Sequence, residues 1–185
     1  MKKWLLLLLG IICFFAVLGF FMSDHFFYRK IIKADNMAVP DDVFKWITTN
    51  IPTAKGSNQV PAPYTTPRLA IETKRKLYCD EGSILMATFC YELGYKTRLV
   101  DFIGMDSIAH HTILEVFNNG RWKSYDFFNN TQYSTYKEYV SFPLLMVNYR
   151  RYPGWYNQLV NHNYFIKKIF LKIRGIDESR YSVKK

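Results

Sequence analysis

A chain of 185 residues has room for one modest domain and a short extra segment, which excludes two full domains. Its hydrophobic fraction of 49% is ordinary for a folded protein and excludes a wholly disordered chain. The formal net charge of +10 is uneven, since residues 137–185 hold ten Lys or Arg against three Asp or Glu. A basic tail of this kind indicates an anionic surface nearby, such as phospholipid or acidic glycopolymer.

The N-terminus is strongly apolar. Residues 4–22 carry no charged side chain, and as a helix they would span roughly 28 Å, close to the ~30 Å hydrocarbon core of a bilayer. Lys2 and Lys3 precede this run and favour an N-inside orientation. We therefore expect residues 1–23 to be a single-pass transmembrane signal-anchor, with the rest of the chain extracytoplasmic. A cleaved secretory signal is the alternative, and it would leave the remaining chain in the same compartment.

The next part, residues 24–66, is expected to be a juxtamembrane helix followed by a proline-rich loop. Residues 40–51 have apolar side chains at helical spacing, with Pro40 in the first turn. The stretch 52–67 then holds four prolines together with glycine, serine and asparagine, a composition typical of a loop.

The folded domain is expected over residues 67–160. We expect helices over 67–77 and 79–93, the second ending at Gly94, and strands over 99–103, 112–117 and 122–127, with an Asn119-Gly120 hairpin turn. Helices followed by antiparallel strands predict an α+β fold in which the second helix packs on an antiparallel sheet.

The last part, residues 161–185, is a basic amphipathic C-terminal segment. Residues 164–174 place apolar side chains mostly on one side of a helix and basic ones opposite. Such a helix could lie on a membrane surface and contact lipid, or it could dock on the domain. We expect no nucleic acid partner, because the anchor would place this segment outside the cytoplasm.

The chain contains three cysteines. Cys13 lies in the expected anchor, while Cys79 and Cys90 would be about 16 Å apart on one helix, too far for a disulfide. A free thiol in an oxidising compartment needs a reason, and reactivity is one. We interpret Cys90 as a small buried hydrophobe and Cys79 as the reactive thiol.

Cys79 stands at the start of its predicted helix. The free backbone N–H groups and the helix dipole there favour a thiolate and could hold an oxyanion. Asp80 and Glu81 in the same turn oppose a negative sulfur. A histidinium partner is therefore needed.

Strand register supplies a partner for that thiol. If residues 119–120 form a two-residue turn, Ile113 lies opposite Asp126, and His111 lies on the same face as Asp126. Their side chains can close the diagonal of ~7–8 Å. His110 would face the other way. Each of these residues alone is more often structural, and only their combination predicts a nucleophile, a base and a residue that orients the base.

The same residues resemble the transglutaminase-like superfamily over about residues 67–130. The helix and first strand match at Cys79, Leu93-Gly94, Arg98 and Leu99-Val100, and the His and Asp strands match at His111, Glu115-Val116, Trp122 and Asp126. The order Cys, His, Asp is also that of the family.

The resemblance implies a papain-like α+β core, with residues 67–160 as the catalytic domain. It implies that Cys79 is the nucleophile, His111 the base and Asp126 the orienting residue, with neither metal nor cofactor. The expected activity is acyl transfer on peptide or protein amides through a Cys thioester.

Hydrolysis by a protease or amidase and transamidation by a primary amine share that thioester, and we favour hydrolysis. The alternative is a catalytically silent, membrane-tethered module that binds peptide or glycan in an envelope assembly.

Overall fold

The computed structural model describes residues 2–56, 66–133, 144–152, 169 and 172–173. The helices are α1 (Lys2–Ala34), α2 (Pro40–Asn50), α3 (Pro67–Thr73) and α4 (Cys79–Glu92). The strands are β1 (Lys96–Gly104), β2 (Ala109–Asn118), β3 (Arg121–Asp126), β4 (Thr131–Tyr133) and β5 (Leu144–Arg151). The structure is therefore α+β, as the order of the predicted elements indicated.

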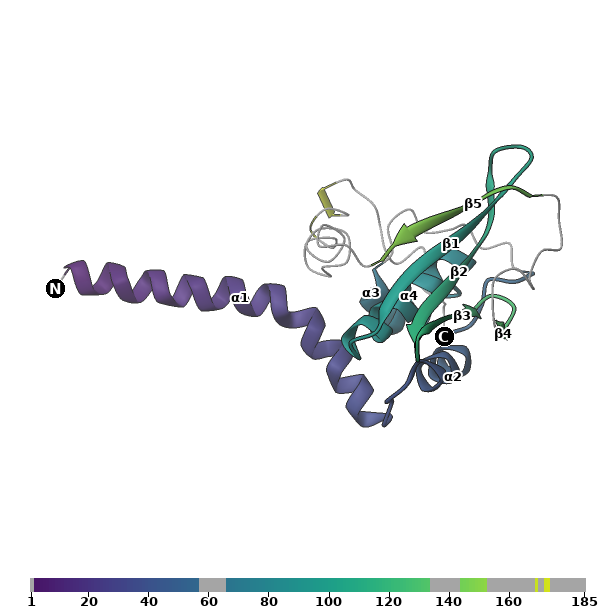
Figure 1. Cartoon of the computed structure of the whole chain (residues 1–185). Coiled ribbons are helices and arrows are strands. Elements are labelled where there is room, and N and C mark those ends of the chain that lie inside the picture. Colours follow the sequence, from purple (N-terminus) through teal and green to yellow (C-terminus); the bar gives the residue numbers. More distant parts are fainter. Residues whose placement is uncertain (1, 57–65, 134–143, 153–168, 170–171, 174–185) are drawn as a thin grey trace.

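The strands form one antiparallel sheet in the order β4-β3-β2-β1-β5. Helix α4 packs on one face of it, and Figure 1 shows α1 running from this domain far out to the N-terminus. The core forms because α4 places buried side chains at helical spacing against period-two side chains of the strands. These residues include Leu85, Met86, Phe89 and Cys90 from α4 and Leu99, Leu114 and Val116 from the sheet.

The prediction of a transmembrane helix over residues 1–23 is wrong. Helix α1 does not end with the apolar run but continues unbroken to Ala34, for 33 residues, through side chains such as Asp24 and Arg29. Its second half packs on the domain. Along the part of the chain that the structure describes, no helix has both the length and the apolar character needed to cross a membrane.

The second half of α1 belongs to the core of the domain. Tyr28 and Ile32 are buried, and the Tyr28 ring meets Phe89 of α4 edge to face, with 5.5 Å between ring centroids. The next residue but one towards the N-terminus, Phe26, is exposed. Helix α1 therefore docks through one side only.

Polar contacts flank this apolar contact. Arg68 at the start of α3 lies 3.3 Å from Asp24, and its guanidinium stacks 4.7 Å above the Phe27 ring. At the end of α4, Glu92 accepts from His25 at 2.6 Å. The two pairs hold α1 against α3 and α4.

The β2–β3 hairpin has the expected turn and register. Asn119 and Gly120 both have positive φ, 51° and 78°, as a tight hairpin turn requires. Asn118 pairs with Arg121, and the pairing continues to Leu114 opposite Tyr125.

Three local features of the structure differ from the sequence-based expectation. Helix α3 ends at Thr73 because Lys74 adopts the left-handed conformation, φ 48°. Leu77, expected on that helix, instead forms a parallel bridge with Thr53. Strands β4 and β5 were not expected, because nothing in their sequence alternates clearly. The predicted C-terminal helix, residues 164–174, lies largely outside the described residues.

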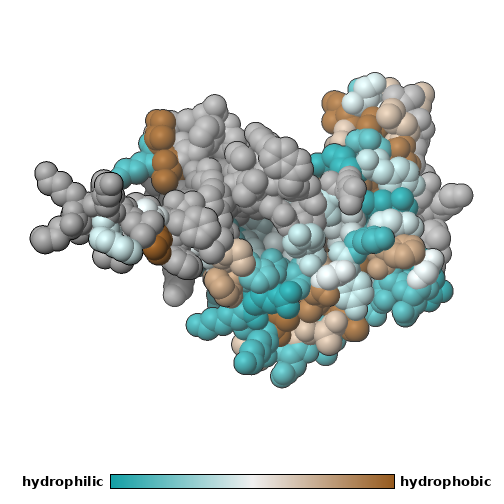
Figure 2. All heavy atoms as spheres, turned by 60° about the vertical axis from the view of Figure 1, so that its left-hand side comes forward, coloured by the Kyte–Doolittle hydropathy of each residue, from teal (hydrophilic) through white to brown (hydrophobic). Residues whose placement is uncertain are grey.

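Hydrophobic side chains gather at the projecting end of the β1–β2 hairpin (Figure 2). Met105 and Ile108 in this turn are exposed.

The docking of α1 gives a stability prediction. Tyr28→Ala should lower the free energy of unfolding by about 3 kcal/mol, because it removes a fully packed ring from between α1 and α4. Phe26→Ala, two residues away and exposed, is the matched control and should change it by less than ~0.5 kcal/mol. Urea unfolding of the full chain measures both; equal values would mean that α1 does not dock as described.

Candidate active site

Cys79 is the first residue of α4, as the sequence predicted, and is half-buried. A carboxylate of the same turn secures this helix start: Glu81 accepts the Tyr78 backbone N–H at 3.0 Å. The thiol therefore lies at the positive end of a well-anchored helix, where the dipole favours negative charge.

Buried Arg75 supports that helix start. Its Nη2 atom lies 2.6 Å from Glu81 Oε1, and its side chain is almost wholly inaccessible. Burial raises the pKa of Glu81, and the Tyr78 hydrogen bond and the Arg75 charge offset only part of this effect. Arg75 could not be recognised from the sequence, because a single arginine in a predicted helix carries no signal of burial.

Helix α4 approaches β3 very closely one turn after Cys79. A Cβ atom on Gly82 would lie 1.9 Å from Cδ1 of Phe127. Only glycine therefore fits at this position. The contact sets the depth at which the N-terminus of α4, and with it Cys79, meets the end of β3.

His111 and Asp126 meet in the way that the hairpin register predicted. His111 Nε2 lies 2.9 Å from Asp126 Oδ2, and both residues are buried, Asp126 completely. The Phe102 ring stacks nearly parallel to His111, at 6.3 Å between centroids and an interplanar angle of 13°. Packing and hydrogen bonding together restrict the imidazole to one orientation.

His110 points away from this pair. The register of β1 against β2 shifts between Phe102 and Ile103, and His110 is the extra residue of the irregularity. Its ring lies 2.8 Å from Asp106 in the exposed hairpin turn. The structure thus brings His111, and not His110, to Asp126.

Cys79 lies close enough to His111 to act on the pKa of the imidazole, which completes the row of three side chains. Burial lowers the pKa of His111, but the hydrogen bonds and charges of Asp126 and Cys79 outweigh burial and raise it to about 9. For the Asp126 carboxyl the effects are reversed. Burial raises its pKa, but the hydrogen bonds from His111 and Asn129 hold the pKa below its ordinary value. The site therefore favours an imidazolium beside a carboxylate at neutral pH.

Cys90 differs from the half-buried Cys79 in its burial. It is fully buried within α4, and burial raises the pKa of its thiol. Its interpretation as a small buried hydrophobe is confirmed.

The other residues behind the family resemblance meet at the far end of the sheet. Arg98 Nε lies 2.6 Å from Glu115, and the guanidinium stacks 4.1 Å from the Trp122 ring. Ser124 donates to the second oxygen of Glu115 at 3.1 Å. These residues stabilise the sheet through a partly buried ion pair and do not touch Cys79.

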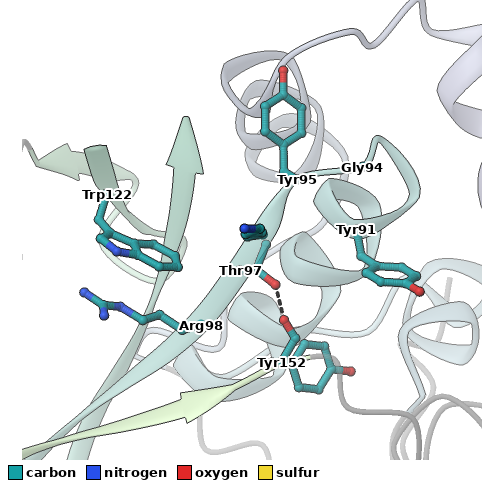
Figure 3. A pocket seen from close by; sticks show the side chains of 8 residues that line it. Tyr91, Gly94, Tyr95, Thr97, Arg98, Trp122 and Tyr152 are labelled. Atoms are coloured by element: carbon teal, nitrogen blue, oxygen red, sulfur yellow. Dashed lines mark hydrogen bonds between the residues drawn. The ribbon is translucent and has the colours of Figure 1, made fainter. Parts of the chain in front are cut away.

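A hollow of about 440 Å³ lies beside them (Figure 3). It is lined by Tyr91, Gly94, Tyr95, Lys96, Thr97, Arg98, Trp122 and Tyr152. Because it opens at the C-terminal end of α4, the helix separates it from Cys79 by about 20 Å.

Among the described residues, no group of three or more His, Cys, Asp or Glu side chains could hold a metal ion. No protein-family model matches this chain, and no curated protein matches it. The transglutaminase-like resemblance therefore stays a prediction that rests on the residues and their geometry.

The first prediction from the site separates the two histidines. His111→Ala should slow iodoacetamide alkylation of Cys79 at pH 7 on the order of tenfold or more, because the adjacent cation that supports the thiolate is gone. His110→Ala, which removes only an exposed contact, should react like the unmodified chain. Site-resolved mass spectrometry reads the label on Cys79. Slower alkylation in His110→Ala than in His111→Ala would mean that His110, and not His111, lies beside the thiol.

A second prediction concerns Gly82. Gly82→Ala should destabilise the fold by about 1–3 kcal/mol, because the new methyl group collides with the Phe127 ring. Gly10→Ala in α1 is the matched control, since nothing lies within 4 Å of its added Cβ. Adding Phe127→Leu to Gly82→Ala should recover part of the loss. Melting curves without such recovery would contradict the close approach.

Proposed function

We propose that this chain is a cysteine acyl-transfer enzyme of the transglutaminase-like kind that acts on peptide or protein amides. The observation that carries the proposal is the row Cys79–His111–Asp126, with the thiol at a helix start and a 2.9 Å contact from imidazole to carboxylate. A buried imidazole held between a thiol and a carboxylate matches what nucleophilic catalysis requires.

In the proposed reaction, the Cys79 thiolate attacks the amide carbonyl and forms a tetrahedral oxyanion. In this proposal, the backbone N–H groups of the first turn of α4, which lack acceptors within the helix, donate to that oxyanion. The His111 imidazolium gives its proton to the departing amine, the C–N bond breaks, and a thioester on Cys79 remains. Asp126 stabilises the imidazolium and keeps its ring in place.

The thioester is then resolved by a second nucleophile. Neutral His111 accepts a proton from water, the C–S bond breaks, and a carboxylic acid and the free thiol result. A primary amine in place of water would give a new amide. We favour hydrolysis, and the observation that would favour transamidation is transfer to an added amine in competition with water.

A second candidate function is a binding module without catalytic activity. The hollow lined by Tyr91, Trp122 and Tyr152 supports it, because aromatic faces and a nearby cation suit a peptide or glycan ligand. The two functions differ in one readout: only the enzyme forms a covalent acyl intermediate on Cys79.

Acylation should show a characteristic pH dependence. The pKa of His111 is raised to about 9, so the imidazolium persists at neutral pH and is lost as the pH rises through that value. The acylation rate with an activated acyl ester should therefore fall on the alkaline side near pH 9, after correction for spontaneous hydrolysis. A rate that keeps rising up to pH 11 would contradict the proposed ion pair.

Substitutions test the roles within the row. Cys79→Ala should abolish the acyl adduct, while Cys90→Ala should retain it in the folded fraction.

Asp126→Asn should slow acylation on the order of ten- to a thousandfold, or ~1.4–4 kcal/mol of barrier, because it removes the charge of the side chain but keeps its shape. The rate per folded molecule is obtained by pairing active-site titration with melting curves. An unchanged rate in Asp126→Asn would remove that residue from the site.

A further inference from the structure

Asp126 has a second partner besides His111, three residues further along the chain. The backbone N–H of Asn129 donates to Oδ1 at 3.0 Å, and its side-chain Nδ2 donates to Oδ2 at 2.9 Å. Oδ2 is also the atom that His111 contacts at 2.9 Å. Asn129 therefore donates a hydrogen bond to each oxygen of the buried carboxylate. Oδ2 accepts from both the Asn129 amide and the His111 imidazole.

The orientation of the Asn129 amide is itself determined by a third residue. Lys55, in the loop that follows α2, donates from Nζ to Asn129 Oδ1 at 3.0 Å, across 74 residues of sequence. An ammonium group can only donate, so the amide oxygen must face Lys55 and the amide nitrogen must face Asp126. The contact is exposed and so adds little stability, but it removes the ambiguity in the direction of the amide.

We propose that Asn129 is a positioning residue of the candidate site, and that Lys55 holds its amide in the working direction. The proposal rests on the proposed function, because Asn129 acts through Asp126 and His111. It extends the row of three side chains to Lys55–Asn129–Asp126–His111–Cys79.

A buried carboxylate is stable only where hydrogen-bond donors surround its oxygens. Without the amide, Oδ2 would keep only its contact with His111 and Oδ1 only the backbone N–H of Asn129, so the carboxylate would lose one of its three donors. The charged or titratable groups that face Asp126 are His111 from β2, Cys79 of α4 behind it, and Lys55 through the amide. With one donor fewer, the pKa of Asp126 should rise, so the carboxylate would be lost at a higher pH as the solution is acidified.

The competing explanation is that Asn129 serves only the turn after β3. In that role the backbone N–H contact to Oδ1 would suffice, and any residue could supply it. Asn129→Ala separates the two explanations because it keeps the backbone donor and removes only the amide. Lys55→Met removes the ammonium and keeps most of the chain length, so it tests the direction of the amide alone.

The experiment measures acylation of Cys79 by an activated acyl ester, and its alkylation by iodoacetamide, from pH 4 to pH 10. Asn129→Ala should slow acylation at pH 7 on the order of tenfold to a hundredfold per folded molecule. Its acid limb should move to higher pH. Lys55→Met should show a smaller loss in the same direction. Gln132→Ala, an exposed change on neighbouring β4, is the control and should match the unmodified chain.

Two outcomes would overturn the proposal. Asn129→Ala could retain the unmodified rate and pH profile, or its loss could equal the loss of folded protein in melting curves, which would leave Asn129 a structural residue. Failure of the proposed function looks different: the unmodified chain would then form no acyl adduct on Cys79 at all.

Discussion

The hydrogen bond between His111 and Asp126 is the constraint on which the candidate site depends. A carboxylate with no solvent exposure is costly unless donors surround it, and here the donors come from β2 and from the turn after β3. The contact exists only in one register of the β2–β3 hairpin, because a slip by one residue would turn His111 to the other face. The Asn119-Gly120 turn therefore determines which side chains meet about 20 Å of strand away from it.

Helix α4 links this contact to the rest of the molecule. At its first turn, Glu81 and Arg75 secure the backbone, and the Gly82–Phe127 approach brings the thiol to the end of β3. At its last turn, Glu92 accepts a hydrogen bond from His25 of α1. One helix thus carries the proposed nucleophile at one end and the docking contacts for the N-terminal helix at the other.

Much of the candidate site could be predicted from sequence, because it follows from local rules. Asn-Gly sets the hairpin turn, alternation sets the faces of its strands, and helical spacing with Gly94 at the end sets α4. These rules act over a few residues, so they identified the start of α4 at Cys79 and the face that His111 shares with Asp126.

The rest was decided by contacts between segments distant in sequence. Lys55 reaches Asn129 across 74 residues, and Arg75 is buried only because the folded domain closes over it. Likewise, the apolar run of residues 4–22 predicted an isolated spanning segment, whereas α1 continues to Ala34 and packs Tyr28 against α4. Sequence alone determined the local elements and the register of one hairpin, since both depend on neighbouring residues. Only the tertiary structure decided which side chains surround Asp126, because that depends on how separate segments pack.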